Sequence, residues 1–180
     1  MGVVFLLHLI HHYNVHNRKQ KTMTKFIYSL IFITIFFSSC KGQMDSSSST
    51  QHKIEKIEYS TTRCFGTCPV FSLTINADKS AEWDAKMFNK INGEKISGKF
   101  HSKINKKEYN EIVILLNEMD FEKLENNYQI EYTDAQSSTL KITYDNGKTK
   151  AIQDYGLQGT EELKQLYKIL FDLRENQKWK

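Results

Sequence analysis

The 180-residue sequence lacks several signatures that would identify a reaction. It contains three cysteines, no Gly-x-Ser-x-Gly nucleophile motif and no Asp-x-Asp-x-Asp-Gly calcium ladder. No apolar run reaches the roughly 20 residues that a membrane-spanning helix needs. The first acidic residue of the chain is Asp45. These absences argue against a serine hydrolase, an EF-hand protein and a single-span membrane protein.

An N-terminal leader is the first informative segment that is present. Lys25 precedes a twelve-residue, mostly apolar run, Phe26–Phe37, and Ser38 and Ser39 lead from it into Cys40. This order is typical of a secretory signal peptide, and the run would rise only about 18 Å as a helix. The residues up to Cys40 resemble the lipobox of bacterial lipoproteins. The resemblance implies that Cys40 is acylated and becomes the first residue of the mature protein.

The leader divides the chain into four parts. We expect residues 1–22 to be an upstream extension that is not normally translated, and residues 23–39 to be the signal peptide. Residues 40–52 would be the lipidated cysteine with a serine-rich tether, and residues 53–180 a single domain. Four of the 25 basic residues precede Cys40, so 21 residues of each sign follow. This balance gives no electrostatic reason to expect a nucleic-acid partner, and the membrane would be reached through lipid.

Hydrophobic periodicity predicts an α+β fold for the domain. Alternating residues predict six strands, at 53–61, 69–76, 81–88, 94–101, 137–144 and 148–155. Spacings of three and four predict two amphipathic helices, at 105–119 and after Thr160, with Asn105 and Thr160 as N-caps. Asn146-Gly147 predicts a two-residue type I′ turn. We therefore expect an antiparallel sheet of about six strands with two amphipathic helices packed on it.

One local motif stands out, the segment RCFGTCP at residues 63–69. An even cysteine pair in an oxidising compartment favours a structural disulfide that closes a tight loop. A redox-active dithiol is the second interpretation, with Arg63 lowering the pKa of a thiolate. A metal site is the third, but two thiolates need two more ligands, and only His52 and His101 follow Cys40. No metal or cofactor is therefore expected.

This motif resembles the Arg-x-Cys-Phe-Gly-x-Cys-Pro signature of an uncharacterised family of lipoprotein domains, mostly from Bacteroidota. The residues that match directly are Cys64, Phe65, Gly66, Cys68 and Pro69. Arg63 departs from the signature because it directly precedes Cys64. The resemblance extends over roughly residues 54–179. It implies a location and a related fold but no reaction, because the family's function is unknown.

Five residues in or beside predicted loops are possible binding residues: Arg63, Phe65, Glu131, Asp134 and Asp154. Two of the three carboxylates could converge at one end of the sheet, although solvated loop charges are the more ordinary interpretation. The irregular segment around Glu131 and Asp134 is long, and long irregular segments are more often functional than short turns.

Two glycines before the second predicted helix suggest a further site. Gly156 and Gly159 flank Leu157-Gln158, a pattern compatible with anion binding at a helix N-terminus. However, Glu161 and Glu162 in the first turn of that helix would repel an anion. We therefore do not predict an anion site at this position.

The sequence favours a binding or inhibitory module over an enzyme, with no catalytic residue assigned. The module would present a sheet face or loops to an unknown envelope protein or ligand. One alternative is a thiol-disulfide redox protein that uses Cys64 and Cys68, and another is a purely structural envelope component. Lys41 after the acylated cysteine, with no acidic cluster following it, favours the periplasmic leaflet of the outer membrane.

Overall fold

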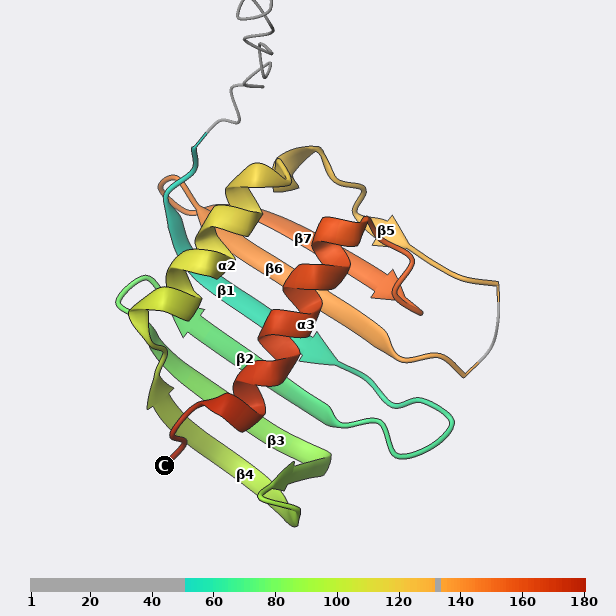
Figure 1. The fold of residues 1–180 in the computed structure, drawn as a ribbon. Helices are drawn as coiled ribbons and strands as arrows, with labels where there is room; N and C mark the ends of the chain where they lie inside the picture. Colours follow the sequence, from blue (N-terminus) through green and yellow to red (C-terminus); the bar gives the residue numbers. More distant parts are fainter. Residues whose placement is uncertain (1–50, 132–133) are drawn as a thin grey trace, which may run out of the picture. The chain divides into compact units, whose positions relative to one another are not determined.

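A computed structural model describes residues 51–131 and 134–180. The predicted leader, Cys40 and the tether up to residue 50 lie outside the described residues. The described part contains one sheet and two long helices, which lie across the same face of the sheet (Figure 1). The strands are β1 (Ile54–Thr61), β2 (Val70–Asn76), β3 (Ser80–Ile91), β4 (Glu94–Lys103), β5 (Asn127–Tyr128), β6 (Ser137–Tyr144) and β7 (Lys148–Tyr155). The helices are α2 (Lys106–Glu118) and α3 (Glu161–Asn176), with a short 3₁₀ helix, η1 (Phe121–Lys123).

The sheet order is β4-β3-β2-β1-β6-β7-β5, and every neighbouring pair is antiparallel except β5 with β7. The predicted α+β fold and all six predicted strands are confirmed. The seventh strand, β5, was not predicted because it has only two residues and alternation needs a longer run to be visible.

The hairpin between β6 and β7 is confirmed, but its turn is longer than predicted. Tyr144 pairs with Lys148, which leaves three residues in the turn. These are Asp145, Asn146 and Gly147, with φ values of 42°, 68° and 87°. Asp, Asn and Gly are the residues that adopt positive φ at least cost, so the local sequence suits this longer turn as well.

The core lies between the helices and one face of the sheet. Alternate residues of the central strands point into it, as do the predicted apolar stripes of both helices. The N-caps are confirmed, because the Asn105 and Thr160 side chains accept hydrogen bonds from the backbone N–H groups of Glu108 and Leu163. The buried apolar residues all fall between Ile54 and Leu173. The compact unit Ser48–Lys180 therefore contains a complete core and is expected to fold on its own.

The outer face of the sheet is polar and carries ion pairs. Glu58 on β1 lies 3.1 Å from Lys56 and 3.7 Å from Lys141, and Lys99 on β4 lies 3.2 Å from Glu82. An antiparallel sheet with one solvated face is expected to show this alternation of apolar and polar residues. In the described part of the chain, no helix is long and apolar enough to cross a membrane.

The C-terminal residues close part of the outer edge of β4. The backbone N–H of Lys180 donates to the His101 carbonyl at 3.0 Å, and the His101 N–H donates to Lys180 at 2.8 Å. Trp179 packs on Trp83 and donates from Nε1 to the Leu173 carbonyl. These contacts hold the segment after α3 against the sheet.

Candidate functional site

The cysteine motif forms a closed loop between β1 and β2. Cys64 and Cys68 are joined by a disulfide, with their Cα atoms 5.7 Å apart. Gly66, between them, has a φ of 151° and donates its N–H to the Cys64 carbonyl at 2.9 Å. This conformation is rare for residues with a Cβ, which explains the glycine. The disulfide that the sequence predicted is present.

Two of the predicted binding residues meet at this loop. The backbone N–H of Phe65 donates to the Asp134 carbonyl at 3.0 Å. Gln136 fastens the base of the loop, because its Nε2 donates to the carbonyls of Thr62 and Pro69 at 2.8 and 2.9 Å. The Phe65 side chain remains 89% exposed. The loop backbone is therefore fixed while its aromatic side chain faces solvent.

The remaining predicted binding residues have different positions. Arg63, Glu131 and Asp134 are exposed, as expected of loop charges. Asp154 is not, since it lies in β7 and is fully buried. The expectation of a solvated charge is wrong there because Asp154 has internal partners: its carboxylate accepts hydrogen bonds from the backbone N–H groups of Gln158 and Gly159 at 2.7 and 3.0 Å.

Asp154 also explains the two glycines before α3. The amides of this segment do bind an anion, but that anion is the protein's own carboxylate. A Cβ on Gly159 would lie 2.9 Å from Asp154 Oδ2, and a Cβ on Gly156 would lie 2.6 Å from the Ile130 side chain. Both glycines are needed for close packing of the segment that leads from β7 into α3.

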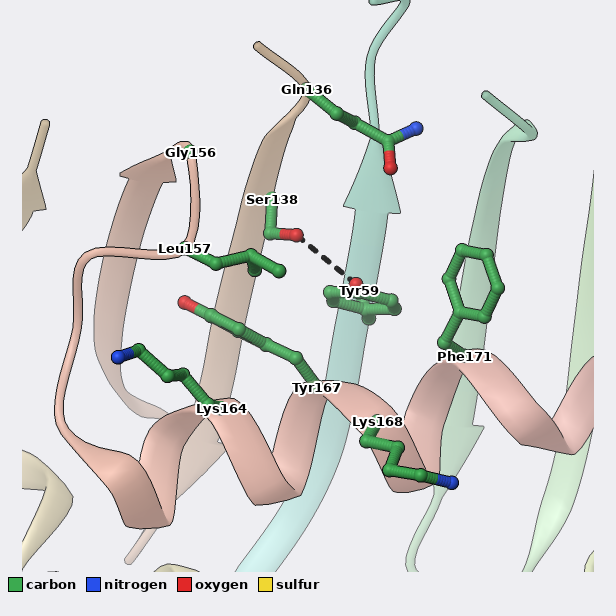
Figure 2. A pocket seen from close by; sticks show the side chains of 9 residues that line it. All are labelled: Tyr59, Gln136, Ser138, Gly156, Leu157, Lys164, Tyr167, Lys168 and Phe171. Carbon is green, nitrogen blue, oxygen red and sulfur yellow. Dashed lines mark hydrogen bonds between the residues drawn. The ribbon is translucent and has the colours of Figure 1, made fainter. Parts of the chain in front are cut away.

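A cavity of about 410 Å³ opens beside this segment, between α3 and the strands. The strands β1 and β7 finish, and β2 and β6 begin, at one end of the sheet, which we call the loop end (Figure 1). The residues that line the cavity lie at this end (Figure 2). Its walls are mostly apolar, which is typical of ligand pockets. The lining residues are Tyr59, Gln136, Ser138, Gly156, Leu157, Lys164, Tyr167, Lys168 and Phe171.

Two tyrosines line the cavity side by side. The rings of Tyr59 and Tyr167 are stacked, with centroids 5.6 Å apart and an angle of 22° between their planes. The Tyr59 hydroxyl is 3.1 Å from Ser138 Oγ, an interaction drawn in Figure 2. Burial raises the pKa of Tyr59 to about 12 and raises the pKa of Tyr167 as well. Both phenols therefore remain protonated at neutral pH.

The Tyr167 hydroxyl differs from that of Tyr59 in its lack of a partner. Tyr167 is 2% exposed, and its hydroxyl makes no hydrogen bond within residues 51–131 and 134–180. Figure 2 shows the side chain extending from α3 toward Leu157, with the hydroxyl at its tip. Leaving a buried hydroxyl unpaired costs about 1–3 kcal/mol. A ligand in the cavity would supply the missing partner.

The charged residues that line this cavity are both lysines. Lys164 and Lys168 lie one turn apart on the cavity side of α3 (Figure 2). Their ammonium groups pair with Glu161 at 2.8 Å and with Asp172 at 2.5 Å. Such surface pairs contribute only about 0–1 kcal/mol, so either lysine can exchange its partner for a ligand at little cost.

Leu157 at the cavity has an unfavourable backbone conformation. Its φ is 56°, and its side chain is 47% exposed. A left-handed conformation costs a residue with a Cβ about 1–2 kcal/mol, and little burial offsets this cost. Strain of this kind is often found at binding sites, where the surrounding structure maintains it.

A second cavity, of about 450 Å³, lies on the other side of Phe171. It is lined in part by Thr67 and Pro69 from the cysteine loop and by the buried Arg174. Phe88, which also lines it, has a φ of 58° and is 40% exposed. A positive φ at an exposed apolar residue, as at Leu157, is therefore also found at the second cavity.

Sequence reasoning did not identify the cavity residues. Tyr59 lies in a predicted strand and Tyr167 in a predicted helix, and their periodicity indicates burial but does not reveal the cavity. One available signal was the spacing of Lys164, Tyr167, Lys168 and Phe171, which places two basic and two aromatic side chains on one face of α3. Among the described residues, no cluster of His, Cys, Asp and Glu could hold a metal ion.

Comparison with known proteins gives a family and no activity. No curated protein matches the chain. One family model, described as a domain of unknown function, matches residues 55–174, a segment that includes the cysteine loop, the lining of the first cavity and most of α3. The chain therefore belongs to this family, DUF6438.

Proposed function

We propose that the protein is a lipid-anchored component of the cell envelope whose folded domain binds a ligand at the loop end. The single observation that carries the binding proposal is the buried, unpartnered hydroxyl of Tyr167 at an apolar cavity. A structural domain gains nothing from that arrangement, because the hydroxyl costs stability while it has no partner. A bound ligand that pairs with it would recover this cost.

The cysteine loop supports the proposal as a rigid boundary of the site. Its disulfide and the hydrogen bonds from Gln136 fix the chain between β1 and β2. A binding surface that is already ordered loses less conformational entropy when a ligand arrives. Phe65, at the tip of this loop, and Leu157 offer exposed apolar surface at the same end of the sheet.

The proposed location rests on the leader. The order of Lys25, the short apolar run and Cys40 supports export and acylation. Lys41 supports transfer to the outer membrane, with the domain facing the periplasm. Because acylation anchors a protein through buried CH₂ groups, the balanced charge after Cys40 is compatible with this location.

The anchor is tested by metabolic labelling of the full-length protein with a palmitate analogue. We expect the wild type to incorporate the label and to fractionate with the outer membrane, and Cys40→Ala to do neither. Cys64→Ser with Cys68→Ser is the matched control, because it removes the other two cysteines and should keep the label. An unlabelled wild type would contradict the anchor.

The binding function is tested with the domain of residues 48–180. Protein-observed NMR of the isotope-labelled domain would screen mixtures of neutral, cationic and anionic small molecules, each containing an apolar group. We expect at least one class to bind and to shift the signals of Leu157 and Tyr167. If no class shifts these signals, the cavity is not a ligand site and the binding proposal fails.

The alternative of a thiol-disulfide protein uses the same loop. Cys64 and Cys68 are half-buried, so a small reductant can reach them. Mass spectrometry after alkylation, at graded thiol concentrations, separates the two functions. A disulfide that resists all but strong reductant supports a structural role, whereas ready reduction supports redox exchange.

A further inference from the structure

We infer that the loop-end cavity binds a monoanionic amphiphile, a carboxylate head on an apolar body, with the head held by Tyr167 and Lys164. This inference rests on the proposed binding function and adds the chemical class of the ligand. It follows from three features of the cavity: a hydrogen-bond donor without an acceptor, charges of one sign and an apolar wall.

The donor is the Tyr167 hydroxyl. Because burial raises its pKa, the phenol keeps its proton at neutral pH and can donate one hydrogen bond. The hydroxyl is buried and has no partner in the described part of the chain. A carboxylate oxygen is a strong acceptor, and a hydrogen bond to a charged group contributes about 1.5–3 kcal/mol. The head group that best fits this position is therefore an anion.

The charges at the cavity favour the same sign of ligand. Of the nine lining residues, the two charged ones are Lys164 and Lys168. Lys164 precedes Tyr167 by three residues on α3, so its ammonium group and the Tyr167 hydroxyl project from one face of the helix toward one head group (Figure 2). A cationic head would meet like charge at this position.

The acidic groups near the cavity already have partners. Glu161 and Asp172 pair with the two lysines, and these pairs lie at the surface where a ligand can replace them. Asp154 is buried, and the N–H groups of Gln158 and Gly159 satisfy its carboxylate, although its charge contributes to the raised pKa of Tyr167. The charged lining side chain beside the Tyr167 hydroxyl is therefore Lys164, whereas the Lys168 ammonium points away from that hydroxyl (Figure 2).

The apolar body would lie along the aromatic wall. Tyr59 and Phe171 present ring surface, and Leu157 presents an exposed aliphatic side chain at the mouth of the cavity. A cavity of about 410 Å³ lies at the lower end of the range for small-molecule pockets, which is roughly 300–1,000 Å³. A medium-length aliphatic acid and a bicyclic aromatic acid both have the required chemistry.

The test uses isothermal titration of residues 48–180 with four probes below their micelle concentrations. Decanoate and 2-naphthoate are the anionic probes, decanol is the neutral control and decyltrimethylammonium is the cationic control. We expect at least one acid to bind at least tenfold more tightly than decanol, with affinity that falls as salt rises. The acid that binds more tightly shows whether the apolar body of the ligand is aliphatic or aromatic.

Three variants test whether the head group lies where we place it. Tyr167→Phe should weaken binding of the preferred acid about tenfold, because it removes only the donor. Lys164→Gln should weaken it by a similar factor, and Lys168→Gln should weaken it less. The matched controls are Tyr109→Phe and Lys106→Gln on α2, which lie outside the cavity lining and should bind like the wild type.

Three results would overturn the inference. Tighter binding of decanol or of the cationic probe, with shifts at Leu157 and Tyr167, would reject an anionic ligand and leave the proposed binding function standing. Acid binding that neither Tyr167→Phe nor Lys164→Gln weakens would place the anion elsewhere. If no probe binds and the broad NMR screen also finds no ligand, the binding function and the inference fail together.

Discussion

The end of the sheet at His52 and the loop end, where the cavity lies, differ in how their buried polar side chains are paired. His52, just before β1, is 6% exposed, and its backbone N–H donates to Asn117 Oδ1 at 2.7 Å. Its Nδ1 is hydrogen-bonded to Asp145 Oδ2 at 2.6 Å, and its Nε2 lies 3.1 Å from a Glu122 carboxylate oxygen but without hydrogen-bond geometry. Tyr167, at the loop end, is equally buried but has an unpartnered hydroxyl in the described structure.

The difference separates residues that stabilise the fold from residues that we propose contact a ligand. Around His52, the rings of Phe121 and Tyr144 pack edge-on at 5.2 and 5.0 Å between centroids. Leu157, at the loop end, keeps an unfavourable φ and an exposed side chain. Binding sites commonly retain such costs because activity, and not stability, maintains them. Substitutions of His52 should therefore lower stability, whereas suitable substitutions of Tyr167 and Leu157 should raise it.

The largest effect should come from His52→Ala. This substitution removes a buried ring and its bond to Asp145, so we expect the free energy of unfolding to fall by about 2–3 kcal/mol. Urea denaturation at pH 7 would measure it. His101→Ala is the matched control, because that side chain is exposed and its loss should change stability little. An equal loss in both variants would contradict the importance of the His52 contacts.

The same variant should alter the acid dependence of stability. The hydrogen bond from His52, and then that from the Lys53 backbone N–H, hold the pKa of Asp145 below its usual value of 3.8. A carboxyl with a lowered pKa in the folded state contributes stability above its unfolded pKa and loses it as pH falls through the folded value. The difference between the wild type and His52→Ala should therefore shrink below about pH 4. A constant difference down to pH 2 would exclude this linkage.

The second effect concerns the cysteine loop, the most constrained part of the loop end. Replacing Cys64 and Cys68 by serine should lower the free energy of unfolding by about 2 kcal/mol, because a five-residue closed loop limits the unfolded chain. Urea denaturation of the oxidised and fully reduced wild type provides an independent measurement of the same quantity. If reduction leaves the midpoint unchanged, the disulfide is not a structural element of this end.

Tyr167→Phe should produce a smaller effect of opposite sign. Removing an unpaired hydroxyl should raise the free energy of unfolding by about 1 kcal/mol. Tyr59→Phe is the matched comparison, because it breaks the bond to the buried Ser138 and should lower stability by a similar amount. Thermal denaturation of both variants without ligand would measure the two stability changes. A loss of stability in Tyr167→Phe would mean that the hydroxyl has a structural partner.

The smallest effect should be found at Leu157. Glycine adopts a φ of 56° without steric cost, so Leu157→Gly should raise the free energy of unfolding by less than about 1 kcal/mol. Leu157→Ala removes most of the side chain but keeps the strain, so it should give no gain. Chemical denaturation would compare them. Equal stability of the two variants would show that the backbone of this segment relaxes freely.

The fold was predictable because its signals are local. Asn105 and Thr160 cap helices through residues three positions away, and the strands show regular alternation. The cavity was not predictable in the same way, since Tyr59 and Tyr167 come from distant parts of the chain. Their periodicity predicts burial but cannot show which buried hydroxyl has a partner. Asp154 illustrates the same limit, because its burial depends on amides in a segment whose path the sequence does not determine.

The two edges of the sheet have a consequence for self-association. An unpaired edge strand can recruit the same strand of a neighbouring molecule, and this hazard grows when molecules are concentrated at a surface. Here one edge is the two-residue β5. The other is β4, which carries Lys95, Lys99 and Lys103 and is partly closed by Lys180. A population of this protein held on a membrane by lipid, as we propose, would thus remain dispersed at densities that would cause a sheet with open edges to aggregate.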